Sequence, residues 1–317
     1  MSTRVRQLLG LLIGLGLLAA LLVHTGLSGL RAALQGLPPW LWLAAPALLL
    51  ASHGLRAARI HAELSGHGAL GIGACLRIGL LHSAAVNLLP LRGGELAYPW
   101  LVHRYSGIGR LQAAVSLLRM RGQDMVVLGS LALLCMPWWP WSLRCLAVAT
   151  LLALVALLLV QGRRWATLAA GAPAPQWRRL LHLLVVGGRG TAWGWGFSVA
   201  SWSLKLMAIG IVLAAAAGAP AEPAFRGALA GELSALWPLQ APAGLGTYEA
   251  AVWLATAWPA NWPGGGGAEA TVVGAALLAH AVVWVTTLGA AGLAWLTWTP
   301  AALAVPALDR IRSTSTP

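Results

Sequence analysis

Six long apolar segments dominate this chain and leave few folds open to it. A helix needs about 20 consecutive apolar residues to cross the hydrocarbon core of a bilayer. The segments that reach roughly this length with few charges are Leu8–Leu30, Leu37–Leu55, Ser116–Met136, Leu143–Gln161, Thr191–Gly218 and Val272–Trp298. The sequence therefore predicts an all-α, polytopic membrane protein with six full spans.

Charged residues are too few for a water-soluble surface. Only 9% of the 317 residues are charged, whereas an ordinary globular domain carries about a quarter. Tryptophan is abundant, and many of the 18 indoles lie near the ends of the expected spans, where such rings prefer the headgroup level. These are Trp40, Trp42, Trp138, Trp139, Trp141, Trp258, Trp262, Trp295 and Trp298. The composition excludes a soluble enzyme and indicates an aromatic belt.

The net charge of +13 indicates membrane topology rather than nucleic-acid binding, because basic residues cluster between the apolar segments. The clusters are Arg4/Arg6, Arg56/Arg59, Arg104/Arg110, Arg163/Arg164/Arg178/Arg179 and Arg310/Arg312. Placing them in the cytoplasm gives cytoplasmic N- and C-termini in a bacterial inner membrane. We expect an uncleaved first span, one transmembrane domain over residues 1–306, an interfacial loop at Arg163–Arg189 and a short cytoplasmic tail at 307–317.

Two further apolar regions are interrupted by proline and glycine. Leu70–Trp100 is broken at Pro90, Gly93 and Gly94, and Ala224–Trp262 is broken at Pro238, Pro242, Gly244 and Gly246. The charge pattern requires each region to begin and end on one side of the membrane, so both are predicted to be re-entrant hairpins that enter from opposite faces. Non-helical backbone at membrane depth survives only where it is buried in protein or lines a wet cavity. Two such breaks suggest an inverted repeat with a site between its halves.

Charged residues near these breaks are the candidates for function, since a charge at membrane depth costs roughly 2.5–3.5 kcal/mol. Arg92 and Glu95 sit in the first break, and Glu232 and Glu249 flank the second. We interpret them as a polar groove in which guanidinium groups meet a lipid phosphate. Glu95 and Glu249 are predicted to share one cavity, with arginines between them.

Other polar residues leave more than one interpretation. Arg121 and Asp124 share a helix face at i,i+3 spacing, either as part of the groove or as an internal ion pair. Lys205 lies mid-span and either snorkels or pairs with Glu232. His53 and His82 are interpreted as packed or interfacial.

The sequence indicates no metal, cofactor or catalytic residue. Cys75, Cys135 and Cys145 have no CxxC spacing, and the histidines lack the spacing of metal ligands.

Three motifs follow one another along the chain. They are Asn87-Leu88-Leu89-Pro90-Leu91-Arg92-Gly93-Gly94-Glu95, Arg121-x-x-Asp124 and Pro242-Ala243-Gly244-Leu245-Gly246-x-x-Glu249. In order and spacing they resemble the lysylphosphatidylglycerol synthase transmembrane family, also called flippase-like domain proteins. Departures from the family pattern stand at Leu91, Tyr98, Met120 and Ala243.

The resemblance implies a lipid-handling membrane module without the aminoacyl transferase domain of the family's bifunctional members. It implies a headgroup site made of Asn87, Arg92, Glu95, Arg121, Asp124, Gly244, Gly246 and Glu249. We expect a flippase for a phospholipid, a polyprenyl-linked lipid or a hopanoid-type lipid, and not an enzyme. The alternative is a membrane partner that presents lipid to a separate synthase or glycosyltransferase.

Overall fold

The computed structural model describes residues 28–65, 70–168, 191–235, 244–257 and 266–297, together with the single positions 16, 19 and 23. Within this part of the chain every regular element is helical, which confirms the predicted fold class. The helices are α2 (Leu41–Leu64), α3 (Ile72–Leu88), the 3-10 helix η1 (Pro90–Leu96), α4 (Ala97–Ser106), α5 (Arg110–Leu134), α6 (Trp141–Leu168), α8 (Thr191–Ala217), α9 (Ala221–Ser234), α10 (Thr247–Ala257) and α11 (Gly266–Leu296). Residues 28–36 are also helical.

Four of the described helices are long and apolar enough to cross a membrane. They include Leu41–Leu64, Trp141–Arg164, Trp193–Ala217 and Ala270–Leu296. Helix α5 has 25 residues but carries three charged side chains in its middle, at Arg119, Arg121 and Asp124. Most of the expected first span, the loop at 169–190, the prolines of the second break and the C-terminal tail lie outside the described residues. The count of six spans therefore stays a prediction.

Helix α2 does not end at Leu55 as predicted but continues to Leu64. Arg56 and Arg59 therefore lie within the helix, and Arg59 is buried. The prediction that they form a loop cluster was wrong. Arg59 has a carboxylate partner inside the bundle, Asp124, so the helix can carry this charge without leaving the apolar interior.

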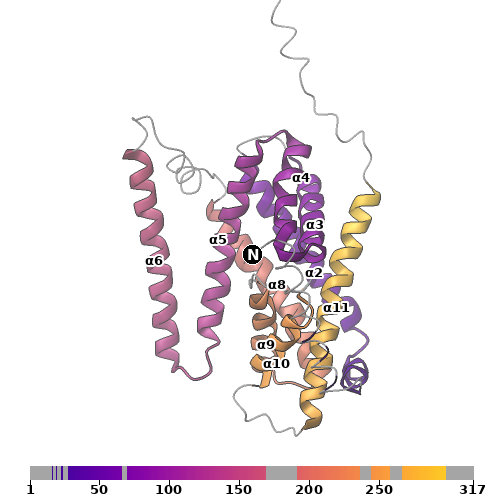
Figure 1. The fold of residues 1–317 in the computed structure, drawn as a ribbon. Coiled ribbons are helices and arrows are strands. Elements are labelled where there is room, and N and C mark those ends of the chain that lie inside the picture. Colours follow the sequence, from indigo (N-terminus) through magenta and orange to yellow (C-terminus); the bar gives the residue numbers. More distant parts are fainter. Residues whose placement is uncertain are drawn as a thin grey trace, which may run out of the picture.

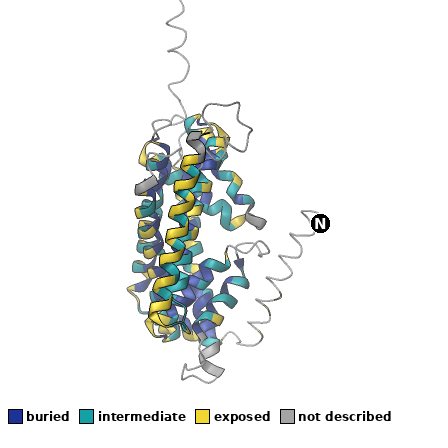
Figure 2. Ribbon diagram, turned by 90° about the vertical axis from the view of Figure 1, so that its left-hand side faces the viewer, coloured by how far each residue is buried: buried dark blue, intermediate teal, exposed yellow. Residues whose placement is uncertain are grey.

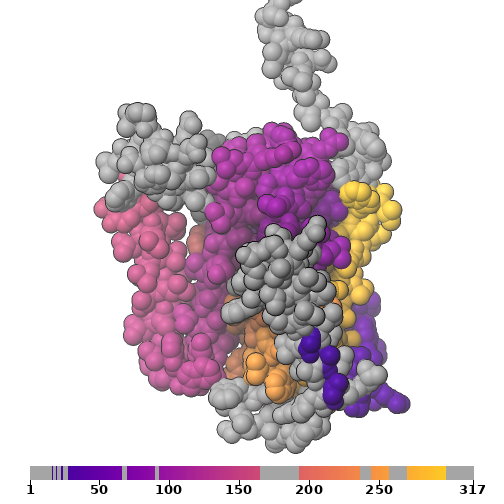
Figure 3. Space-filling view, viewed as in Figure 1, coloured from indigo at the N-terminus to yellow at the C-terminus, as the bar shows by residue number. Residues whose placement is uncertain are grey.

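The two regions broken by proline and glycine form helical hairpins. Helices α3 and α4 pack against each other across η1, and α9 packs against α10. The longest of these four helices has 17 residues, fewer than the roughly 20 that a full crossing requires. The α3–α4 hairpin occupies the upper half of the bundle and the α9–α10 hairpin the lower half (Figures 1 and 3). The two hairpins thus lie at opposite ends of the bundle.

Glycine permits the close packing inside both hairpins. A β-carbon at Gly94 would lie 2.3 Å from the carbonyl carbon of Ala85, so η1 rests directly on the backbone of α3. In α9, a β-carbon at Gly231 would lie 2.6 Å from the ring of Tyr248 on α10. Gly227 precedes Gly231 by one helical turn and makes a similar approach to Thr256. Small residues at this spacing let two helices approach closely within a membrane.

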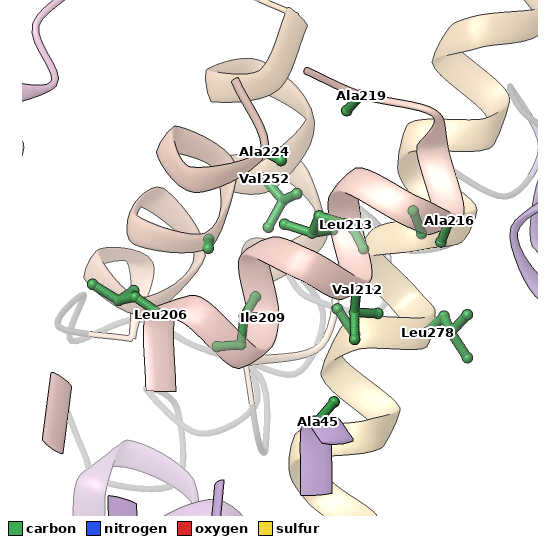
Figure 4. Close-up of a cluster of buried hydrophobic side chains, with 14 of the residues drawn as sticks. Ala45, Leu206, Ile209, Val212, Leu213, Ala216, Ala219, Ala224, Val252 and Leu278 are labelled. Carbon is green, nitrogen blue, oxygen red and sulfur yellow. The ribbon is translucent and has the colours of Figure 1, made fainter. Parts of the chain in front are cut away.

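The main hydrophobic core surrounds α8. Leu206, Ile209 and Leu213 of α8 are buried, and Val252 of α10 and Leu278 of α11 belong to the same cluster (Figure 4). This core binds the second hairpin to the long helices and so fixes the position of the polar residues described below.

Helix α6 lies at the edge of the bundle and packs against α5. It faces the viewer in Figure 2, where most of its residues are exposed. Leu146 and Leu158 are among its exposed apolar side chains, and Trp141 at its start is exposed as well. An apolar outer surface with indoles at helix ends suits a lipid environment.

Candidate functional site

A cavity of about 260 Å³ lies at the centre of the helices. Its walls come from both halves of the chain, including α2, η1, α5, α8 and α9. The charged side chains that line it are Arg56, Glu95, Arg121, Asp124, Lys205 and Glu232. Such a concentration of charge inside an apolar bundle marks this cavity as the candidate site.

Two ion pairs in the lining of the cavity each join two different helices. The Nη2 atom of Arg121 donates to Oε1 of Glu95 at 2.8 Å and so joins α5 to η1 of the first hairpin. The Nζ atom of Lys205 donates to Oε2 of Glu232 at 2.6 Å, which joins α8 to α9 of the second hairpin. Each hairpin therefore contributes one carboxylate to the cavity. Of the two interpretations that the sequence left open for Lys205, the structure shows the pair with Glu232.

Asp124 belongs to a buried network that holds three helices together. Its Oδ1 atom accepts hydrogen bonds from Arg59 Nη1 of α2 at 2.6 Å and from Ser198 Oγ of α8 at 2.7 Å. Arg121 lies farther away, with Nη1 at 3.8 Å from Oδ2. The i,i+3 pair that the sequence indicates is present, but Arg59 is the main partner of Asp124.

Arg56 differs from the other cations of the cavity. In the described part of the chain no carboxylate lies within 4.0 Å of its guanidinium, and its Nη2 atom is buried without a hydrogen-bond partner. Its Cζ atom lies 4.8 Å from the ring centroid of Trp202, in a cation–π contact. The group in direct contact with the Arg56 guanidinium is therefore an aromatic ring, and the nearby carboxylates Asp124 and Glu232 act on it from beyond salt-bridge distance.

The charges of the described cavity and its network do not cancel. The cations are Arg56, Arg59, Arg121 and Lys205, and the carboxylates are Glu95, Asp124 and Glu232. Each carboxylate has a cation as partner, so one positive charge, that of Arg56, is left over. An excess cation in a low-dielectric environment favours the binding of an anion.

A second cavity, of about 60 Å³, adjoins the first. Its lining includes Arg59, His82 and Tyr98, and it shares Arg56, Ser83, Arg121 and Asp124 with the central cavity. Arg121 also contacts residues of both cavities. Its Nη2 atom lies 3.4 Å from Nε2 of His82, which lines the second cavity, and 2.8 Å from Oε1 of Glu95, which lines the first. The polar interior therefore extends from the central cavity towards the first hairpin.

Glu249 does not line the central cavity but is enclosed by protein. The residue is fully buried, its Oε1 atom lies 2.6 Å from Nδ1 of His280, and its Oε2 atom accepts the backbone N–H of Gly246 at 2.6 Å. A Glu at the third helical position that accepts the backbone N–H of the N-cap residue, here Gly246, is half of a capping box. The side chain of Glu249 therefore caps the N-terminus of helix α10.

The prediction that Glu95 and Glu249 share one cavity is not met, because Glu232 supplies the second carboxylate. Gly244 and Gly246 adopt positive φ angles of 76° and 82°, which explains why glycine is needed at both positions before α10.

The structure places the remaining sequence candidates as follows. Asn87 lines the central cavity with Glu95, Arg121 and Asp124. The side chain of Arg92 lies outside what the structure describes. Sequence reasoning missed Arg56 and Trp202. The available signal was the spacing of Arg56 and Arg59 at i,i+3, which gives two cations on one face of a helix that continues through both.

The chain matches the sequence profile of the lysylphosphatidylglycerol synthase transmembrane region over residues 7–304. The chain belongs to this family. No curated protein shows a significant sequence match to it. Family membership and the apolar helices together establish a multi-pass membrane protein.

Proposed function

We propose that this member of the lysylphosphatidylglycerol synthase transmembrane family is a flippase-like transporter that moves a lipid headgroup between the leaflets of a bacterial inner membrane. The proposal includes no covalent step, so the protein would not act as an enzyme. The central cavity supports it, since about 260 Å³ can take up a polar headgroup while the acyl chains stay in the surrounding lipid.

In this proposal the upper end of the bundle in Figure 1 faces the cytoplasm. The α4–α5 connection, flanked by Arg104 in the last turn of α4 and Arg110 at the start of α5, lies at that end, whereas the α5–α6 connection lies at the other. Both chain termini would be cytoplasmic. The two hairpins would be re-entrant, and their breaks would approach the bilayer midplane from opposite leaflets.

Arg56 carries the proposal, because no carboxylate among the described residues lies within 4.0 Å of its guanidinium. A surplus cation at membrane depth is stabilised by an anion, and a guanidinium binds phosphate oxygens through paired N–H donors. A phospholipid or a polyprenyl phosphate would supply that anion. A neutral hopanoid-type lipid would leave Arg56 without a counter-charge, so we propose a phosphate-bearing lipid as the substrate class.

A proteoliposome assay tests this function. The purified full chain is reconstituted into vesicles that contain phosphatidylglycerol with a fluorescent label on a short acyl chain, and dithionite quenches the label in the outer leaflet. We expect the protein to make the inner-leaflet label accessible, and Arg56→Gln to abolish this movement. The control is Arg104→Gln, because Arg104 is an exposed arginine at the end of α4.

Two outcomes contradict the proposal. Equal movement by the wild type and Arg56→Gln would remove Arg56 from the site. Binding of the labelled lipid without any movement between leaflets would contradict transport, and it would support the alternative in which the protein presents lipid to a synthase or glycosyltransferase.

A further inference from the structure

We infer that Trp202 is a positioning residue of the anion site: its indole ring holds the Arg56 guanidinium in place of a carboxylate, so that the N–H donors of Arg56 stay available to a phosphate. This inference rests on the function proposed above. It assigns to an aromatic side chain a role that the charged residues of the cavity do not fill.

The geometry around Trp202 differs from that of an ordinary packing tryptophan. The ring lies under two cations, with Arg56 Cζ at 4.8 Å and Lys205 Nζ at 5.3 Å from its centroid. Both distances lie within the roughly 6 Å over which a ring face attracts a cation. Trp202 and Lys205 are at i,i+3 on α8, whereas Arg56 comes from α2, so the ring connects two helices.

The two cations differ in how they depend on the ring. Lys205 is also paired with Glu232 at 2.6 Å, so its charge is balanced without Trp202. Among the described residues no carboxylate lies within 4.0 Å of Arg56, so Asp124 and Glu232 act on its charge only from a distance, whereas Trp202 is in direct contact with it. Removing the ring should therefore affect Arg56 more than Lys205.

An aromatic partner has a chemical consequence that a carboxylate would not have. A carboxylate holds arginine by accepting its N–H groups, which are the same groups that bind phosphate. A ring face attracts the cation through its quadrupole and accepts none of the in-plane N–H donors. Arg56 and Trp202 both line the central cavity, and the structure shows no hydrogen bond from Nη2 of Arg56 or from Nε1 of the buried Trp202. The ring contact therefore leaves the Nη2 donors of Arg56 uncommitted.

The alternative is that Trp202 only fills space in the core around α8, to which it belongs. The two interpretations predict different effects on lipid binding when Trp202 is replaced by a side chain with a weaker ring face or with none. Phenylalanine keeps a weaker ring face, whereas leucine fills much of the volume with no ring face at all. Trp195, two turns earlier on α8 and packed against the same core, provides a matched packing control.

The test is a double-mutant cycle read out as binding of dihexanoylphosphatidylglycerol to the full chain in detergent micelles. We expect Trp202→Leu to weaken binding by about tenfold and Trp202→Phe by only a few-fold, in the order of cation–π strength. Trp195→Leu should leave the affinity unchanged. In the Arg56→Gln background, Trp202→Leu should add less than a further twofold, because its partner is already gone.

The outcomes separate this inference from the proposed function. Equal losses for Trp202→Leu and Trp202→Phe, or a full tenfold loss that persists in the Arg56→Gln background, would overturn the positioning role of Trp202. If Arg56→Gln weakens binding while Trp202→Leu does not, the inference fails and the anion site stands. If Arg56→Gln binds as tightly as the wild type, the proposed site itself fails and the role of Trp202 falls with it.

Discussion

Arg121 and Glu95 form the ion pair that connects the break of the first hairpin to helix α5, with Nη2 and Oε1 at 2.8 Å. Both side chains line the central cavity, and Arg121 also lines the smaller one. The pair is only partly buried, with 34% of the Arg121 side chain and 23% of the Glu95 side chain exposed. An ion pair with access to the cavity can exchange one partner for a ligand, which a fully enclosed pair cannot do.

The first prediction concerns the mutual dependence of these two residues. Arg121→Gln and Glu95→Gln should each lower the thermal stability of the purified protein, because each leaves a partly buried charge without its partner. The double variant should recover part of the loss, with a coupling towards the lower end of about 0.5–3 kcal/mol, since the pair is partly exposed. Thermal unfolding in detergent measures the four proteins of the cycle. Additive losses would show that the pair contributes nothing as a pair.

Asp124 is predicted to be structural, although the family resemblance places it among headgroup-binding residues. Asp124→Asn removes the negative charge that partners Arg59, whose side chain is only 4% exposed. Loss of one member of a buried pair costs about 3–5 kcal/mol, so we expect little folded protein in the membrane. Ser198→Ala, which removes one hydrogen bond to the same carboxylate, should cost about 1 kcal/mol. Size-exclusion chromatography and thermal unfolding distinguish the two. A stable Asp124→Asn variant without transport would instead place Asp124 in contact with the lipid.

Apolar segment length and the proline and glycine breaks were enough to predict much of the fold. Helices α6, α8 and α11 lie where the sequence indicates, and each broken region is a hairpin of short helices. The sequence failed at the end of α2, because Arg56 was counted as a cytoplasmic charge. A positive-inside argument cannot distinguish a loop arginine from a half-buried one such as Arg56, whose partner Trp202 lies far along the chain on α8.

The candidate site was predicted only in part for a related reason. Glu95 and Arg121 both line the cavity, Glu95 from η1 directly after Gly94 and Arg121 from α5. Glu249 follows an equivalent break, but its carboxylate caps α10 and binds His280 instead. The Gly-x-x-Glu pattern fits both a ligand site and a helix start, and long-range contacts decide between them.

Glu249 therefore gives a further prediction. Glu249→Gln keeps an oxygen that can accept the Gly246 N–H but loses the charge that faces His280, so the variant should be less stable. Because Glu249 does not line the cavity of Glu95, the effects of Glu95→Gln and Glu249→Gln on transport per folded molecule should be additive within about 0.3–0.5 kcal/mol. The proteoliposome assay, normalised to folded protein, checks this. A coupling well beyond that range would mean that the two carboxylates act on one ligand.

The two adjacent glycines of the first break provide the last prediction, because they differ sharply in their surroundings. A β-carbon at Gly93 would lie 3.7 Å from its nearest neighbour, Cβ of Leu89, which is an ordinary contact. At Gly94 it would lie 2.3 Å from backbone atoms of Ala85 and Val86, which cannot move aside without distorting α3. We expect Gly93→Ala to fold and transport as the wild type does.

Gly94→Ala should push η1 away from α3 and displace Glu95, the next residue, from Arg121 and the cavity. The cost of forcing atoms into a packed site is typically about 1–3 kcal/mol and is larger where backbone must move. The protein should therefore lose both thermal stability and headgroup movement, and the coupling between Glu95 and Arg121 should disappear in this background. Thermal unfolding, the proteoliposome assay and the Glu95/Arg121 cycle, each repeated in the two alanine variants, measure these effects. If Gly94→Ala behaves like Gly93→Ala in all three, then contact between η1 and α3 does not position Glu95, and the first hairpin must be held in place by other interactions.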